Sequence, residues 1–186
     1  ADGIIHTYAG KDRTGGNPTG DGGPALQATL GKQINGMTVG PDGSLYFALI
    51  GDSHPAGYIR RIDPNGIITT IAGVHYNYTA TDSGDGGPAS QARLTAPIDL
   101  LLGPDGSLYF SEWAGGVNGW KARVRKIDPN GIVTTVVGGG DRPMNDPALT
   151  TTGHPVTKVN IGRAYGLAFG PDGSFYFAPP QGVYRL

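Results

Sequence analysis

Hydrophobic residues gather in short runs along the chain, and turn-forming residues separate one run from the next. Aromatic and β-branched residues dominate segments 45–47, 67–72 and 132–137. Such side chains favour a pleated, half-buried surface, so these segments predict β-strands. The Gly, Pro, Asp and Asn residues between the runs predict tight turns, because they supply fixed or left-handed backbone angles. The chain is therefore expected to be an all-β protein.

The turn residues recur in register, which indicates an internal repeat. Three motifs carry the repeat: Gly-Pro-Asp-Gly-Ser at 40–44, 103–107 and 170–174, Ile-Asp-Pro-Asn-Gly-Ile at 62–67 and 127–132, and Gly-Asp-Gly-Gly-Pro-Ala at 20–25 and 84–89. Corresponding motifs lie about 64 residues apart. The sequence therefore predicts three copies of one unit, which differ mainly in their loops.

Each unit is expected to form four antiparallel strands, named a to d in chain order. The expected ranges are 34–39, 98–102 and 165–169 for a, 44–49, 107–113 and 174–178 for b, 58–62, 123–127 and 183–186 for c, and 67–72 and 132–137 for d. Segments 24–30 and 88–94 are expected to form one or two helical turns. Tandem four-stranded antiparallel units are typical of β-propeller blades.

The two ends of the chain suggest how the units close. Residues 1–10 match residues 64–73, so they are expected to be an orphan outer strand of a single domain, 1–186. That domain would have blades at 34–73, 97–138 and, without an outer strand, 164–186. Propellers have about four to eight blades, so two chains are expected to form one six-bladed ring. The expected strand-pairing residues are Ile4, Ile5, Thr7, Val183, Tyr184 and Arg185.

Other forms of closure remain open from the sequence. The chain is alternatively an excerpt of a longer array, a member of a ring with another number of blades, or a closed monomer of three blades. Pairing of the two end strands would remove an unpaired sheet edge, which would otherwise favour aggregation.

The recurring motifs resemble those of the NHL-repeat family of β-propellers. The resemblance rests on Gly-Asp-Gly-Gly-Pro-Ala, on Gly-Pro-Asp-Gly-Ser-Leu-Tyr-Phe and on Arg-(Arg/Lys)-Ile-Asp-Pro-Asn-Gly-Ile, and it covers nearly the whole chain. The motifs are most similar to repeats in bacterial extracellular proteins and in YD/Rhs-type and teneurin-like shells. This resemblance implies a bacterial extracellular or cell-surface protein. The third copy departs from the pattern, because Thr152 stands where the second copy has Asp85.

Composition narrows the class of partner. The 186 residues include 33 Gly, 15 Pro and no Cys, and the net charge is −1. Without a basic excess, a nucleic-acid partner is not expected. Insertion into a membrane is not expected either, because no apolar run approaches the length of a membrane span. The lack of Cys excludes disulfides and thiolate metal sites.

The b–c and d–a loops differ between copies, whereas the other turns are nearly constant. Variable loops on a constant scaffold are expected to form the interaction face. Aromatic side chains there would give a sugar or peptide a large contact area with a polar handle. The candidate binding residues are His75, Tyr76, Tyr78, Glu112, Trp113, Asn118, Trp120 and Arg163. The alternative is that the aromatic residues cover blade edges or contact the second chain.

Metal and cofactor chemistry has weak support in the sequence. Asp21 and Asp85 precede Gly-Gly, and they are expected to cap the helical turn that follows, with calcium binding as the alternative. The turn carboxylates are expected to be structural; they are Asp42, Asp105 and Asp172. The four His residues lack ligand spacing, so neither a metal nor a cofactor is expected.

The favoured function is a non-enzymatic scaffold that binds a macromolecule or glycan through its loop face. One alternative is a metal-dependent enzyme, lactonase-like or lyase-like, with its site in the central channel. Equivalent channel positions are expected to carry Asn35, Asp99 and Gly166, with Arg163 nearby. The other alternative is a purely structural or engineered half-propeller module. Fold resemblance alone does not decide between these functions.

Overall fold

The structure is a computed structural model that describes residues 3–11, 16–52, 56–75, 83–114, 121–143, 155–180 and 182–186. These residues form an all-β protein made mainly of antiparallel sheets, so the predicted class is confirmed. Three single-turn 3-10 helices interrupt the connections: η1 (Ala25–Gln27), η2 (Ala89–Gln91) and η3 (Val156–Lys158). In the described part of the chain, no helix has the length and apolar character needed to cross a bilayer.

Three sheets follow one another along the chain. The first contains β1 (Gln33–Val39), β2 (Leu45–Ile50), β3 (Ala56–Ile62) and β4 (Ile68–Ala72), in that spatial order. The second contains β6 (Pro97–Leu102), β7 (Leu108–Ala114), β8 (Lys121–Ile127) and β9 (Val133–Gly138), and the third contains β12 (Gly166–Phe169), β13 (Phe175–Ala178) and β14 (Tyr184–Arg185). Neighbouring strands within each sheet run antiparallel.

Two short pairings were not expected from the sequence. Strand β5 (Leu94–Thr95) pairs with β3, so the chain entering the second sheet also adds to the first. Strands β10 (Arg142–Pro143) and β11 (Val159–Asn160) pair in parallel. Both pairings join segments that are far apart in sequence, so local patterns do not reveal them.

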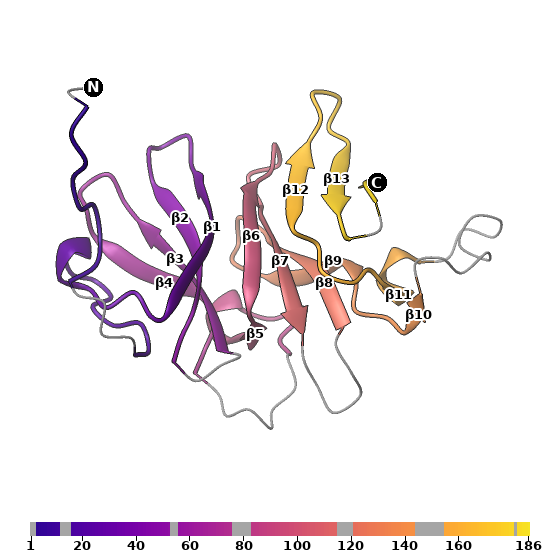
Figure 1. The fold of residues 1–186 in the computed structure, drawn as a ribbon, viewed down its shortest axis with the longest axis horizontal. Coiled ribbons are helices and arrows are strands. Elements are labelled where there is room, and N and C mark those ends of the chain that lie inside the picture. The colour runs from indigo at the N-terminus through magenta and orange to yellow at the C-terminus, as the bar shows by residue number, and fades with distance from the viewer. Residues whose placement is uncertain are drawn as a thin grey trace.

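The sheets stand side by side in chain order, and the two chain ends lie at opposite ends of the row (Figure 1). Apolar side chains fill the space between successive sheets. Ile59 of β3 and Leu100 of β6 share one buried cluster, and Val124 of β8 and Phe177 of β13 share another. Each sheet is therefore stabilised by its neighbour as well as by its own hydrogen bonds.

The Pro-Asp-Gly turns are structural, as predicted. Asp42 accepts hydrogen bonds from the Ser44 backbone N–H at 3.0 Å and from the Ser44 hydroxyl at 2.8 Å. Gly43 has a φ of 81°, a conformation that L side chains rarely adopt. Asp105 and Asp172 make the same contacts with Ser107 and Ser174. This turn fixes the register of each a–b hairpin.

The innermost strands β1 and β6 pass very close to each other. A Cβ atom on Gly36 would lie 2.6 Å from the backbone nitrogen of Leu100, so only glycine fits at this crossing. Hydrogen bonding aligns Met37 with Phe47 and Leu100 with Phe110. Gly36 is thus the counterpart of Asp99, and Asn35 is the counterpart of Ile98. The expected equivalence of Asn35 with Asp99 is therefore wrong by one residue.

Asp21 does not cap η1, which contradicts the capping prediction. No side chain caps η1 or η2. Asp21 instead accepts hydrogen bonds from Arg60 at 2.6 Å and from the Thr70 backbone N–H at 2.9 Å. Burial alone would raise the pKa of Asp21, but these bonds and the charge of Arg60 hold the pKa below its ordinary value. Because Arg60 is fully buried, its charge requires a carboxylate partner.

Candidate binding site

A cavity of about 310 Å³ opens where the inner strands of the three sheets begin. Its lining residues come from the first sheet, from the segment around the start of β6, from the end of β7 and from the chain entering β12. The cavity is lined by Gln33, Asn35, Ile50, Ala96, Ile98, Trp113, Arg163 and Tyr165. It brings together Trp113 and Arg163, predicted for the loop face, and Asn35, predicted for the channel. Loop-face and channel candidates therefore share one site.

Arg163 and Trp113 stack on each other in the wall of this cavity. The guanidinium carbon of Arg163 lies 3.3 Å from the centroid of the Trp113 ring, and its Nη1 donates to the Tyr165 hydroxyl at 3.3 Å. A cation stacked on an aromatic face gains about 0.5–2 kcal/mol. These two contacts hold the guanidinium in a fixed orientation at the cavity wall. One face of Trp113 is consequently covered by Arg163.

Tyr165 is the exposed aromatic residue of the cavity, and it is not one of the binding residues expected from the sequence. Its side chain is 54% exposed, and its backbone N–H donates to Ala178 at 3.0 Å as the chain enters the third sheet. Tyr165 was expected to begin a strand, so it was not considered as a loop residue. Its position two residues after Arg163 was the only available signal. The aromatic surface offered to a ligand therefore comes largely from Tyr165.

The backbone of Ala96 is strained at the cavity wall. Ala96 has a φ of 41°, the only positive φ of a non-glycine residue in the described part of the chain. The carbonyl of Ala96 accepts a hydrogen bond from the Trp113 N–H at 3.4 Å. Such a conformation costs on the order of 1–3 kcal/mol and persists where surrounding structure enforces it. The strained residue thus helps to position Trp113.

Glu112 lies on β7 with its side chain inside the protein, so its predicted exposure on the loop face is wrong. Its carboxylate accepts hydrogen bonds from Arg123 Nε at 2.6 Å and from the Thr95 N–H at 3.0 Å, and it lies 3.4 Å from Arg125. The side chain is 0% exposed. Successive side chains of a strand point to opposite faces, so Trp113 faces out while Glu112 faces in.

The two channel candidates join successive inner strands. Asn35 donates to the Pro97 carbonyl at 2.6 Å, which ties β1 to β6. Asp99 accepts from the Leu167 N–H at 2.8 Å and from the Leu100 N–H at 2.9 Å, which ties β6 to β12. Asp99 is not among the residues that line the cavity. These contacts give both residues a structural role, and they leave the role in a channel site untested.

The remaining binding candidates are not brought to the cavity. His75 is exposed just after β4 and does not line the cavity. Four candidates lie outside the described residues, namely Tyr76, Tyr78, Asn118 and Trp120. Within the described ranges, no three His, Cys, Asp or Glu residues lie close enough together to hold a metal ion.

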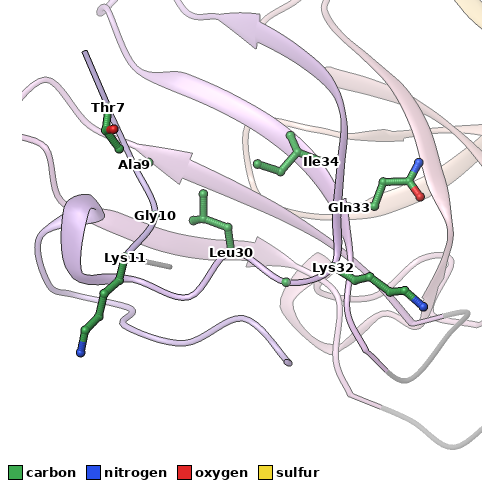
Figure 2. Close-up of a pocket in the computed structure, with 9 residues that line it drawn as sticks. Thr7, Ala9, Gly10, Lys11, Leu30, Lys32, Gln33 and Ile34 are labelled. Atoms are coloured by element: carbon green, nitrogen blue, oxygen red, sulfur yellow. The ribbon is translucent and has the colours of Figure 1, made fainter. Parts of the chain in front are cut away.

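A second, larger cavity of about 690 Å³ separates the N-terminal segment from β1. Thr7, Ala9 and Lys11 line one side, and Ile34 at the start of β1 lines the other (Figure 2). Leu30 lies between these two sides. The described N-terminal residues 3–11, which include the predicted pairing residues Ile4, Ile5 and Thr7, lie at this end of the molecule (Figure 1). The C-terminal residues 182–186, which include Val183, Tyr184 and Arg185, lie at the opposite end. Within one chain the two ends are therefore not brought together.

The family described as the teneurin NHL domain matches residues 79–183, more than half of the chain. The chain belongs to the teneurin NHL domain family. The NHL resemblance is thereby confirmed. Teneurin-1 of Gallus gallus is 34% identical over 94 residues, which are 50% of this chain and 3% of the relative. Human Teneurin-4 is 27% identical over 75% of this chain and 7% of the relative.

A solved structure shows the same kind of fold. A proposed gluconolactonase superposes with a TM-score of 0.51 at 20% sequence identity, over 82% of this chain and 44% of the other. At this identity the likeness concerns the fold alone. The chain is thus an NHL-type propeller domain that spans only a small part of the length of its teneurin relatives.

Proposed function

We propose that this chain is a non-enzymatic binding module that recognises an acidic glycan at the Trp113–Arg163 cavity. The observation that carries the proposal is the guanidinium of Arg163, stacked 3.3 Å from the Trp113 ring in the wall of the 310 Å³ cavity. A guanidinium offers a planar fork of donors that suits a carboxylate, and a fixed fork loses less entropy on binding.

The other lining residues favour a sugar with a negative charge. Among the described residues, the lining contains one cation and no carboxylate, so charge complementarity favours an anion. Gln33 and Asn35 bring amide groups, and Tyr165 brings a phenol beside an exposed ring. Amides and phenols suit hydroxyl groups, and an aromatic ring suits the apolar face of a sugar. A uronic acid combines these features in one residue.

Titration calorimetry with two matched oligosaccharides tests the proposal. One ends in glucuronate and the other ends in glucose. We expect binding of the glucuronate ligand and at least about tenfold weaker binding by the Arg163→Gln variant. Arg61→Gln serves as the control, because Arg61 pairs with Asp42 at a turn and does not line the cavity. Equal binding of both sugars, or binding only to acidic peptides, would contradict the proposal.

The teneurin relatives support a binding role more than an enzymatic one, and the gluconolactonase-like fold leaves the enzymatic alternative to be tested. Incubation with sugar lactones and Ca²⁺ addresses it directly. Hydrolysis above background by the chain, retained when Arg163 is replaced, would favour an enzyme over the binding module. The teneurin relatives also support the proposal that this chain is extracellular or lies at the cell surface. Its bacterial origin stays a prediction.

We further propose that two copies of the chain form one ring of six sheets. The support is that the three sheets stand in a row with the chain ends at opposite sides (Figure 1). Three sheets are fewer than the about four to eight of known propellers. Light scattering is expected to give twice the 19.2 kDa of one chain. A stable mass of 19.2 kDa or of a trimer would contradict the two-chain ring. A dimer that binds no ligand would favour a purely structural module.

A further inference from the structure

The cavity at Trp113 and Arg163 is built from equivalent positions of the repeat. The position seven residues before each Gly-Pro-Asp-Gly-Ser motif and the position five residues before it both line the cavity. The first of these positions carries Gln33, Ala96 and Arg163, and the second carries Asn35, Ile98 and Tyr165. Ile50 and Trp113 share a third position, ten residues after the start of the motif. The sheets therefore contribute corresponding side chains to one space.

Polar side chains lie at two ends of this space, and apolar side chains lie between them. The second sheet packs between the first and the third (Figure 1), and it supplies Ala96 and Ile98. The first sheet supplies the amides of Gln33 and Asn35, whereas the chain entering the third sheet supplies the guanidinium of Arg163. The cavity therefore has a neutral amide end and a cationic end, with an apolar stretch between them.

Hydrogen bonds fix the orientation of the amide end. The Pro97 carbonyl can only accept, so its bond of 2.6 Å with Asn35 identifies Asn35 Nδ2 as the donor. Asn35 Oδ1 consequently accepts from Gln33 Nε2 at 2.7 Å. These two bonds determine which atom of Gln33 stays available. Within the described part of the chain no group donates to Gln33 Oε1, so this oxygen can accept from a ligand.

The volume of the cavity suits one sugar residue. Sites for small molecules have volumes of about 300–1,000 Å³. The cavity, at about 310 Å³, lies at the lower limit of this range. A single ring seated in this space can contact the amide end and the cationic end at the same time. Its apolar face can lie against the apolar stretch between the two ends.

We infer that Gln33 is a specificity-determining residue, which accepts a hydrogen bond from the ring hydroxyl farthest from the carboxylate held by Arg163. The inference rests on the proposed binding of an acidic sugar, and it names the second group that the site recognises. A hexuronic acid carries its carboxylate on C5, and C2 lies opposite C5 in the six-membered ring. The ligand class is thus a uronic acid with a free hydroxyl on C2. Asn35 is a positioning residue, because it acts on this hydroxyl through Gln33.

The two ends contribute differently to recognition. The charge-assisted bonds of Arg163 supply affinity for any uronate. The neutral bond to Gln33 discriminates between uronates. Because Gln33 is exposed and the bond is neutral, the expected discrimination is about threefold to tenfold. The bond from Gln33 to Asn35 restricts the Gln33 side chain before the ligand arrives, which lowers the entropy lost on binding.

Titration calorimetry with two sugars tests the inference. One is the oligosaccharide that ends in glucuronate, and the other is its counterpart with a 2-deoxy terminal residue, which lacks only the C2 hydroxyl. We expect the natural chain to bind the first sugar about threefold to tenfold more tightly. Gln33→Met should bind both sugars equally, because it removes the acceptor and keeps the size of the side chain. Gln91→Met is the matched control and should keep the preference, since Gln91 is exposed in η2 and does not line the cavity.

Two further variants separate the roles of the two ends. Arg163→Gln should weaken both sugars by the same factor and keep the preference for the C2 hydroxyl, because the two contacts are independent. Asn35→Leu should reduce this preference and leave the Kd of the 2-deoxy sugar unchanged. A general loss of folding would instead weaken both sugars.

Failure of this inference is distinguishable from failure of the proposed function. If the natural chain binds glucuronate through Arg163 but Gln33→Met keeps the full preference for the C2 hydroxyl, only the role of Gln33 is overturned. Equal binding of the two sugars by the natural chain would overturn that role as well. If the natural chain binds neither sugar, the proposed function is wrong, and the role of Gln33 is overturned with it.

Discussion

The guanidinium of Arg60 is fully buried, and its Nη2 lies 2.6 Å from the Asp21 carboxylate. Two backbone carbonyls, those of Thr29 and Thr19, accept the other hydrogen bonds of this guanidinium at 3.0 and 2.9 Å. The second sheet repeats the pair, with Arg125 Nη2 lying 2.7 Å from Asp85. In the first sheet, the segment before β1 is thereby held against β3 and β4. In the second sheet, the segment before β6 is held against β8 and β9 in the same way.

Replacement of Asp21 by Asn should therefore destabilise the fold. The variant leaves the charge of buried Arg60 without a carboxylate. Loss of one partner of a buried pair costs about 3–5 kcal/mol, and we expect about 2 kcal/mol because the Asp21 side chain is 49% exposed. Urea unfolding followed by circular dichroism measures the change. Asp141→Asn is the control, since Asp141 is 84% exposed in its pair with Lys121 and should have no measurable effect.

Acid should weaken the fold through the same two carboxylates. Arg125 and Thr135 bind Asp85 and, against the opposing effect of burial, hold its pKa below the ordinary value of 3.8, as occurs at Asp21. A lowered native pKa contributes stability above the unfolded pKa and loses it as the pH falls through the native pKa. The unfolding free energy should therefore decrease as the pH drops below about 4. The decrease should be smaller in Asp21→Asn/Asp85→Asn than in the natural chain; equal pH profiles would contradict this assignment.

The strand and turn pattern was predictable because each turn is encoded locally. The Pro-Asp-Gly turn needs only an Asp that bonds a residue two positions on and a glycine at positive φ, and both are visible in the sequence. The β3–β5 pairing was not predictable, because Gly57 and Leu94 are brought together by the path of the whole connection. The role of Asp21 was misjudged for a related reason. Its partner Arg60 lies 39 residues away, whereas the expected helical turn is adjacent.

The candidate site was predictable only in part. The repeat comparison pointed to variable loops, and two of their residues, Trp113 and Arg163, do line the cavity. Trp113 belongs to the second sheet and Arg163 lies just before the third sheet, so their stacking depends on how these two sheets pack together. The local sequence around each residue contains no information on that packing. The burial of Glu112 had a signal that was not used. Glu112 aligns with Leu49, which is 0% exposed, and it shares a strand face with Phe110.

Replacement of Glu112 by Gln should lower stability without weakening ligand binding. Glu112 is buried between Arg123 and Arg125, so the neutral amide leaves one of two cations poorly compensated. We expect a loss of about 2–4 kcal/mol in the free energy of unfolding, because Arg125 keeps its bond to Asp85. Calorimetry of the folded variant should give an unchanged Kd for the acidic sugar. A weaker Kd with unchanged stability would instead place Glu112 in the binding site.

Replacement of Ala96 by Gly should leave the fold as stable as the natural chain or make it more stable. At an ordinary position, this substitution costs about 0.5–1 kcal/mol, because glycine loses more backbone entropy on folding. Ala96 has a φ of 41°, where glycine avoids a strain of about 1–3 kcal/mol, so the two effects oppose each other. Ala92→Gly is the control: Ala92 has a φ of −72° and is buried, and the substitution should destabilise the fold. Thermal unfolding of both variants measures the difference in Tm between them.

If Ala96→Gly lowered Tm as much as Ala92→Gly, the backbone at the cavity wall would carry no strain. If stability is kept and sugar binding becomes weaker, the rigidity of Ala96 serves to hold Trp113 and Arg163 in place.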